Sequence, residues 1–177
     1  MKPMRDVTIA RMLLRLACEL PDHAALVYPQ RSWTFAELER DAHQLARALV
    51  AEGVRPGDRV AVWATNVPEW FLLQFALARL GAILVTVNTS LRSHELEYLL
   101  RQSGTSVLCT IPGFRELDYL DEIARMGLLP ALRRIVVIGE DPQCQDPRAL
   151  GWGELLAGAG EEDIELDDDL DRVVNMQ

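Results

Sequence analysis

The sequence predicts an α/β fold in which a mostly parallel sheet carries helices on both faces. Short apolar segments rich in valine and isoleucine recur along the 177 residues, and amphipathic segments of helix length separate them. Strands that are apolar on both sides are typical of a sheet covered on both faces, and helical crossovers are typical of parallel pairing. The pattern therefore indicates a doubly wound α/β layer.

Two elements are expected before the first strand of that sheet. Apolar residues recur at every third or fourth position after Thr8, a candidate N-cap, so a helix is expected to continue to Leu20. Residues 24–28 and 32–34 flank a polar turn. Because turn residues between two short apolar segments favour a hairpin, these two segments are expected to pair.

A capping box marks the start of the next helix. Thr34 and Glu37 have the spacing at which each side chain can bond the other residue's backbone amide. Gly53 stands where the helix is expected to end, because glycine readily adopts the left-handed conformation there. The apolar residues between them lie on one helical face and consist of Leu38, Ala42, Leu45, Ala46 and Leu49.

Strand and helix then alternate four times. The helix that begins at Pro68 is expected to be capped by Asn66 and to stop at Gly81, and Ser93 is expected to cap the helix after it. The predicted strands are residues 59–63, 83–87, 107–110 and 135–138, and the predicted helices are residues 68–80, 93–102, 117–126 and, as a short turn, 152–156.

The formal charge of −9 is concentrated near the end of the chain. Acidic residues fill most of positions 161–171, whereas residues 1–160 are almost neutral. A near-neutral body offers no basic surface, so binding to nucleic acid or to anionic lipid is not expected. We interpret the chain as an α/β subdomain of residues 1–160 followed by an acidic connector of residues 161–177.

The cysteines and the N-terminus favour a reducing, cytoplasmic setting. Cys18, Cys109 and Cys144 are odd in number and widely spaced, so they predict neither a disulfide framework nor a zinc site. Arg15 interrupts the N-terminal apolar run, which is too short for a signal sequence or a membrane span.

The residues alone assign no reaction. The sequence has no glycine-rich nucleotide loop after a strand, no HExxH motif and no GxSxG motif. His23, His43 and His94 are interpreted as surface groups rather than as ligands. No metal-binding residue is therefore assigned.

Four aromatic residues raise the alternative of an acyl-binding pocket. Trp63 lies in a predicted strand, and Trp70, Phe71 and Phe75 lie on one predicted helix. Aromatic residues at this spacing are usually buried against neighbouring elements. Core packing is therefore the preferred interpretation.

Four segments in a fixed order resemble the opening of the adenylate-forming enzymes. Residues 32–38 read SWTFAEL, residues 53–62 read GVRPGDRVAV, residues 78–88 read ARLGAILVTVN and residues 95–100 read ELEYLL. Over about residues 8–110 the chain is similar to acyl-CoA synthetases, peptide-synthetase adenylation domains and luciferases. The fatty-acyl-CoA synthetase branch is the most similar.

The resemblance implies the N-terminal part of an ATP-dependent acyl-CoA synthetase. In that family a carboxylate, such as a fatty acid, attacks the α-phosphate of ATP, and CoA then displaces AMP from the acyl-adenylate. ATP, Mg²⁺ and CoA are thus the expected cofactors of the full-length enzyme. The acidic connector is similar to the segment that leads into the family's phosphate-loop strand. Because that loop and the catalytic lysine are expected beyond residue 177, no catalytic residue is assigned, and the isolated chain is expected to be inactive with no cofactor bound.

One residue of the chain is a candidate for cofactor binding. Residues 88–92 follow the C-terminal end of a predicted strand, where open α/β sheets bind ligands. The resemblance implies that a basic residue of this loop contacts a phosphate of CoA, and Arg92 is the nearest equivalent. Ser90 is the alternative occupant of that position, and a plain surface arginine before a helix is the alternative reading of Arg92.

Other functional classes are also compatible with the sequence. A naturally truncated, non-enzymatic α/β binding module is the main alternative, and a small flavodoxin-like nucleotide-binding protein is disfavoured because no glycine loop follows a strand. The expected partners are a fatty acid or other carboxylate, the missing C-terminal portion of the same chain and a second copy in a homodimer, because uncovered apolar faces promote association. Peripheral membrane association of a full-length enzyme also stays open.

Overall fold

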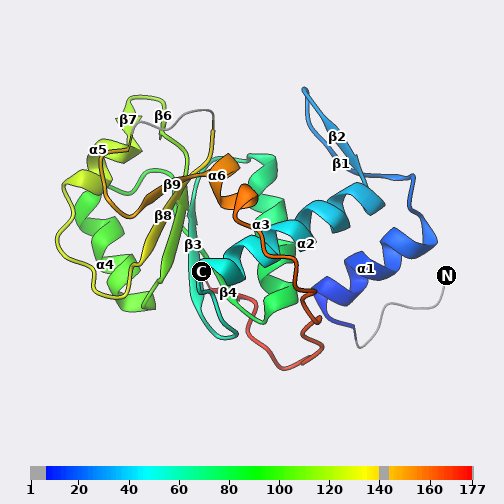
Figure 1. Ribbon diagram of the computed structural model, residues 1–177. Coiled ribbons are helices and arrows are strands. Elements are labelled where there is room, and N and C mark those ends of the chain that lie inside the picture. The colour runs from blue at the N-terminus through cyan, green and yellow to red at the C-terminus, as the bar shows by residue number, and fades with distance from the viewer. Residues whose placement is uncertain (1–6, 140–143, 177) are drawn as a thin grey trace.

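The computed structural model describes residues 7–139 and 144–176, and its main feature is a six-stranded sheet (Figure 1). Every pair of neighbouring strands in this sheet is parallel, which confirms the predicted pairing. From one edge to the other the strands are β10 (Asn175–Met176), β4 (Ile83–Thr86), β3 (Arg59–Trp63), β5 (Val107–Thr110), β8 (Arg134–Val137) and β9 (Ala149–Gly151).

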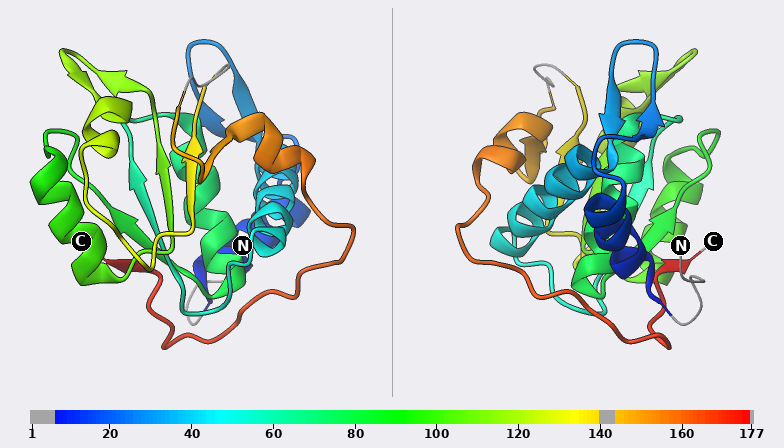
Figure 2. Two further views of the ribbon diagram at one scale, coloured as in Figure 1. Left: turned by 60° about the vertical axis from the view of Figure 1, so that its left-hand side comes forward. Right: turned by 90° about the vertical axis from the view of Figure 1, so that its right-hand side faces the viewer.

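Helices cover both faces of the sheet, as predicted (Figure 2). One face carries α1 (Ile9–Glu19), α2 (Phe35–Ala51), α3 (Pro68–Leu80) and α6 (Trp152–Ala157), and the other carries α4 (Ser93–Ser103) and α5 (Tyr119–Ala124). Two antiparallel hairpins lie outside the sheet, one formed by β1 (Ala24–Val27) and β2 (Ser32–Thr34), the other by β6 (Gly113–Phe114) and β7 (Leu117–Asp118).

Each central strand contributes to two separate hydrophobic cores. In β3, Val60 and Val62 pack with α1, α2 and α3, whereas Ala61 and Trp63 pack on the side of α4 and α5. All four side chains are essentially removed from solvent. Successive side chains of a strand point to opposite faces of the sheet. The two cores therefore explain why the strands are continuously apolar in the sequence.

Several helix ends are formed by the predicted residues. The Thr8 hydroxyl accepts a hydrogen bond from the Arg11 amide at 3.2 Å and caps α1. In the capping box of α2, the Glu37 amide donates to the Thr34 hydroxyl at 3.2 Å, and the Thr34 amide donates to the Glu37 carboxylate at 2.9 Å. Gly81 ends α3 with a φ of 66°, a conformation that favours glycine.

Two predicted caps are wrong. Pro68 is the first helical residue of α3, so Val67 occupies the N-cap position and Asn66 lies one residue too early. In α4 the N-cap position belongs to Arg92, and Ser93 is the first residue within the helix. Neither helix therefore has a side-chain cap of the usual Ser, Thr, Asp or Asn type.

Three segments differ from the predicted secondary structure. The helix expected over residues 117–126 is reduced to α5, because its first two residues form β7. The short strand β9 was not predicted, since its three residues carry no continuous apolar pattern. The apolar residues near the chain end form β10, which pairs with β4.

The aromatic residues were only partly assigned correctly. Trp63 is fully buried, and Trp70 and Phe75 are partly buried against the core on the α1, α2 and α3 side. Phe71 is 41% exposed, so the prediction of core packing is wrong for this residue. It lies on the same helix but on the side that the sheet does not cover.

Candidate functional site

The candidate site lies at the carboxyl ends of β3, β4 and β5. The chain leaving β3 leads to α3 on one face, while the chains leaving β4 and β5 lead to α4 and α5 on the opposite face. Because β3 lies between β4 and β5 in the sheet, the loops of neighbouring strands depart in opposite directions and leave a crevice at the carboxyl ends of the strands, where open α/β sheets bind ligands.

Two buried aromatic side chains support the loop that follows β4. The rings of Trp63 and Tyr119 are stacked, with centroids 3.7 Å apart and planes inclined by 5°. The Trp63 indole nitrogen donates to the Asn88 carbonyl at 3.1 Å, and the Tyr119 hydroxyl donates to the Thr89 carbonyl at 2.8 Å. Burial raises the pKa of the Tyr119 phenol, so it remains a hydrogen-bond donor at neutral pH.

The loop after β4 is also fixed by its own residues. The Asn88 side-chain oxygen accepts from the Ser90 amide at 3.0 Å and from the Ser90 hydroxyl at 2.8 Å. Asparagine forms turns of this kind because its short side chain mimics a backbone carbonyl two residues away. Hydrogen bonds therefore hold the loop before α4 both at its backbone carbonyls and at the Asn88 side chain.

A pocket of about 320 Å³ lies between this loop and the β6–β7 hairpin. Arg92 and Arg115 line it from opposite sides. Arg115 is the only residue other than glycine with a positive φ in the part of the chain that the structure describes, at 56°, and its guanidinium lies 5.0 Å from the Phe114 ring centre. The remaining lining residues are Thr89, Ser90, Phe114, Glu116 and Leu117.

Arg92 keeps most of its side chain accessible to a ligand. The side chain is 66% exposed, and one of its nitrogens lies 3.4 Å from a Glu122 carboxylate oxygen. Arg125 lies at the same distance from that oxygen, so two arginines share a single carboxylate. The Ser93 amide, which donates to Glu122 at 2.7 Å, holds the pKa of this carboxyl below its usual range.

The N-terminus of α4 is already occupied by carboxylates. Glu122 accepts from the Ser93 amide, and Glu95 accepts from the Arg92 amide at 3.0 Å. Free helix N-termini bind phosphate through such amides. Anion binding here would therefore depend on the side chains of the pocket.

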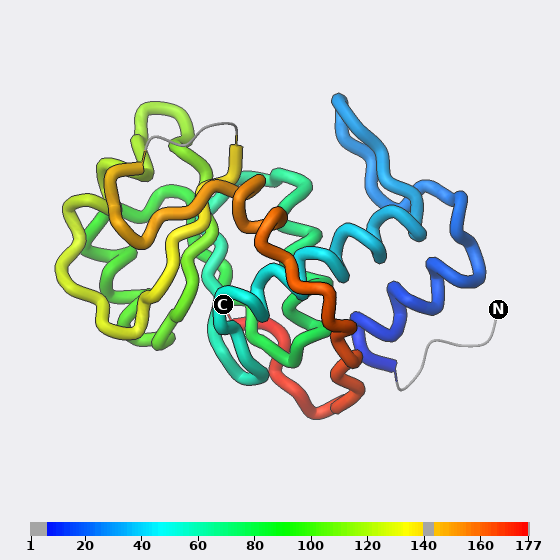
Figure 3. Tube along the Cα trace, in the orientation of Figure 1, coloured from blue at the N-terminus to red at the C-terminus, as the bar shows by residue number. Residues whose placement is uncertain are grey.

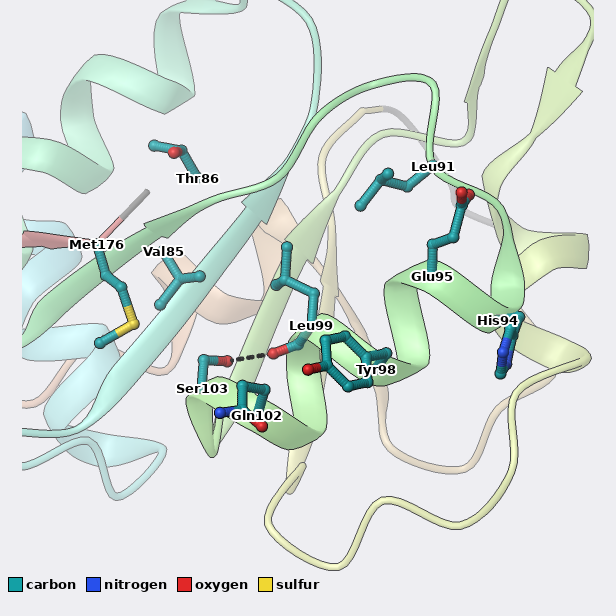
Figure 4. Close-up of a pocket in the computed structure, with 10 residues that line it drawn as sticks. All are labelled: Val85, Thr86, Leu91, His94, Glu95, Tyr98, Leu99, Gln102, Ser103 and Met176. Atoms are coloured by element: carbon teal, nitrogen blue, oxygen red, sulfur yellow. Dashed lines mark hydrogen bonds between the residues drawn. The ribbon is translucent and has the colours of Figure 1, made fainter.

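An open apolar groove lies on the other side of α4 (Figure 4). Its volume is about 710 Å³, and its floor includes Val85 of β4 and Met176 of β10. Tyr98, which is 66% exposed, and Leu99 contribute from α4. The groove therefore follows the edge of the sheet at which β10 is the outermost strand.

The histidines do not form a site. His23 and His94 are exposed, as predicted, whereas His43 is half-buried with its Nε2 atom 3.0 Å from an Asp163 oxygen. Within residues 7–139 and 144–176, no group of three or more histidines, cysteines or carboxylates is arranged to hold a metal ion. In the same residues, no helix has both the length and the apolar character needed to cross a membrane.

The described cysteines are free thiols. Cys109 is fully buried in β5, and this burial raises the pKa of its thiol to about 12. A thiol in that state is not a nucleophile at neutral pH. Cys109 is therefore part of the core.

The residues missed by the sequence analysis come from segments distant from the loop. Tyr119 and Glu122 belong to α5, and Arg115 belongs to the tip of the β6–β7 hairpin. Trp63 was assigned to the core without its bond to Asn88. The spacing of these residues in the sequence does not indicate that they lie close together, because only tertiary packing brings them to the carboxyl ends of the strands.

A parallel sheet covered on both faces, with a pocket formed by loops at the carboxyl ends of its strands, is typical of α/β domains that bind ligands. The chain matches the AMP-binding enzyme family over residues 15–169 and belongs to that family. This confirms the resemblance to the N-terminal part of the adenylate-forming enzymes.

Individual relatives agree with this assignment. The chain is 37% identical over 196 aligned positions to YngI of Bacillus subtilis, a protein assigned to the acyl-CoA synthetases, with 96% of this chain and 34% of YngI covered. It is 33% identical to the mitochondrial medium-chain acyl-CoA ligase ACSF2 of Danio rerio, with 70% of this chain and 21% of ACSF2 covered.

Solved structures give the same result for the fold. The anthranilate CoA ligase AuaEII, in complex with anthranoyl-AMP, superimposes with a TM-score of 0.78 at 30% identity, covering 95% of this chain and 31% of that protein. The N-terminal domain of FACL13 from Mycobacterium tuberculosis superimposes with a TM-score of 0.77 at 25% identity, covering 96% of this chain and 41% of that domain. The chain thus spans between 21% and 41% of the lengths of these four proteins.

The support that Tyr119 gives to the loop can be tested by Tyr119→Phe. The substitution keeps the stacked ring but leaves the Thr89 carbonyl without its donor, so the free energy of unfolding should fall by about 1 kcal/mol. Urea unfolding measures this change. Tyr98→Phe is the matched control, because the Tyr98 ring is largely exposed, and it should leave the stability unchanged. Equal stability of the two variants would contradict the proposed support.

Proposed function

We propose that the chain is the N-terminal part of an ATP-dependent acyl-CoA synthetase that activates a fatty acid or another carboxylate. The observation that carries this proposal is the family match over residues 15–169, together with relatives that are acyl-CoA ligases. The overall reaction joins the carboxylate to CoA and converts ATP into AMP and diphosphate. The acyl group passes through an acyl-adenylate.

The described residues at the carboxyl ends of the strands do not by themselves form a site for ATP and Mg²⁺. Phosphoryl chemistry requires amide, lysine or metal contacts around the phosphates. The amides at the start of α4 are taken by Glu95 and Glu122, and the described residues offer no group suited to a metal ion. Within the proposed synthetase this chain supplies the scaffold and one wall of the cleft, while ATP and Mg²⁺ are held by residues outside it.

The 177-residue chain should therefore show no adenylation activity. Its purified form should give no exchange of labelled pyrophosphate into ATP above the level without enzyme, with fatty acids of several chain lengths present. A longer protein that contains this chain and the following segments is the positive control. Fatty-acid-dependent exchange by the short chain would contradict the proposed division of labour.

Arg92 is proposed to contact a phosphate of the CoA nucleotide. Three features support this role: an accessible guanidinium, a second guanidinium from Arg115 across the same pocket, and a carboxylate partner shared with Arg125. Arginine is well suited to phosphate because its fork of donors matches the phosphate oxygens. Ser90 lines the same pocket and remains the alternative contact.

Kinetics of the complete enzyme test the role of Arg92. Arg92→Ala should raise the KM for CoA by about 10-fold and leave the adenylation rate unchanged, because a charge-assisted hydrogen bond is lost only in the CoA complex. With dephospho-CoA as the substrate, Arg92→Ala should raise the KM by a smaller factor if the 3′-phosphate is the group that Arg92 binds. Arg101→Ala, an exposed arginine further along α4, is the control. If the KM for CoA rose in Ser90→Ala but not in Arg92→Ala, the contact would be assigned to Ser90.

Self-association of the 177-residue chain is proposed to follow from the open groove beside β10. Tyr98, Leu99 and Met176 leave apolar surface accessible there, and such surfaces promote association. Small-angle scattering should therefore report a dimer or a larger species. A monomer with a radius of gyration of ~16 Å would contradict this proposal.

The remaining parts of the proposal concern organisation and setting. Residues 1–160 are proposed to form an α/β subdomain, and residues 161–177 an acidic connector. A cytoplasmic location is supported by the free cysteines, although the ACSF2 relatives are mitochondrial. Peripheral membrane association of the complete enzyme stays open. The alternative function, a naturally truncated α/β binding module, predicts a stop codon directly after the codon for Gln177, whereas the proposed synthetase predicts that the reading frame continues into the phosphate loop.

A further inference from the structure

The acidic segment after α6 returns across the helices and then joins the sheet. Figure 3 shows its path from the end of α6, along the side of α2, past the start of α1, to β10. We propose that Arg79 is a positioning residue that holds this segment at residues 164 and 167 and thereby keeps β10 paired with β4. The inference concerns the described chain and does not depend on ligase activity.

Arg79 contacts the segment through both its side chain and its backbone. One guanidinium nitrogen donates to the Ile164 carbonyl at 3.2 Å, and the Arg79 carbonyl accepts from the Asp167 amide at 2.9 Å. The other terminal nitrogen of the guanidinium pairs with Glu39 of α2. The Arg79 side chain is only 10% exposed. One buried residue therefore connects α2, α3 and two points of the acidic segment.

The end of α3 is shaped to receive the segment. The Asp167 carboxylate lies directly against Gly81, and a Cβ atom at that position would overlap it. Ile164 packs against the hydrophobic core on the same side of the sheet. The contact with Arg79 is thus one part of a fitted surface that includes both polar and apolar groups.

The ionic contacts that join the segment to α1 and α2 are much more accessible to water. Arg11 and Asp168 form an ion pair in which both side chains are about half exposed, and Asp163, the partner of His43, is 88% exposed. Ion pairs at such positions contribute little to stability. Burial lowers the pKa of His43, so it is mostly neutral at pH 7 and adds little charge attraction. The buried Arg79 contacts are therefore the main polar attachment.

The strand β10 needs an attachment of this kind because it is very short. Only two residues pair with β4, and the Leu84 amide donates to the Val174 carbonyl at 3.0 Å. If both contacts with Arg79 were lost, residues 158–174 would form one loop before β10, whereas with the contact at Asp167 in place only residues 168–174 are free. The statistics of loop closure then favour pairing by about fourfold in the attached state, before any contact energy is counted.

Hydrogen exchange of the 177-residue chain tests this inference. Loss of Arg79 alone would leave Glu39 without a partner in a largely buried position, so Arg79→Met is combined with Glu39→Gln, and Glu39→Gln alone is the matched control. The double variant keeps the backbone bond between Asp167 and Arg79 but removes the guanidinium contact at Ile164 that supports it, so the amides of Leu84 and Asp167 should exchange faster than in the control, by up to about fourfold at Leu84. The Ile138 amide, which bonds to Thr110 between β5 and β8, should be unchanged.

Three results can be distinguished. Faster exchange confined to the acidic segment and Leu84, with partial recovery in Arg79→Lys, supports a positioning role. Faster exchange at Leu84, Asp167 and Ile138 alike overturns it, because Arg79 would then contribute only to global stability. Unchanged exchange at Leu84 also overturns it, because β10 would be held by its own pairing.

Discussion

Burial of the sheet on both faces is the constraint on which the rest of the structure depends. β3 lies in the interior of the sheet, and its residues enter two separate cores, with Val60 and Val62 on one face and Ala61 and Trp63 on the other. Because neither face can remain in water, helices must cover both sides, and α3 after β3 lies on the face opposite to α4 and α5, which follow the neighbouring strands β4 and β5. This alternation creates the crevice at the carboxyl ends of the strands, and the loop after β4 lies there.

The core and the candidate site are joined by polar atoms of buried aromatic residues. Trp63 and Tyr119 are large apolar side chains, but each carries one donor that needs a partner once it is buried. The carbonyls of Asn88 and Thr89 supply those partners. The position of the loop therefore follows from the hydrogen bonds that these two buried side chains require. Arg92 lies at the pocket because it stands at the end of that loop.

Buried charges connect parts of the chain that are far apart in the sequence. Glu122 of α5 accepts from the first amide of α4, and Arg79 of α3 bonds to Glu39 and to Ile164 of the acidic segment. Removing one partner of such a pair is costly, because the other charge would stay in a poorly hydrated place. These residues therefore constrain which elements can be neighbours.

The sequence by itself determined most of the helices and the central strands, the parallel sheet and the family, because apolar periodicity, the capping box and the motifs can be recognised along the chain itself. It placed Arg92 in a loop at the carboxyl edge but mistook Asn66 and Ser93 for caps, since a cap depends on where the helix begins to within one residue. Only the tertiary structure brought Arg115 to the pocket and the acidic segment to Arg79. Those contacts join residues separated by tens of positions, and their formation depends on packing that no local pattern records.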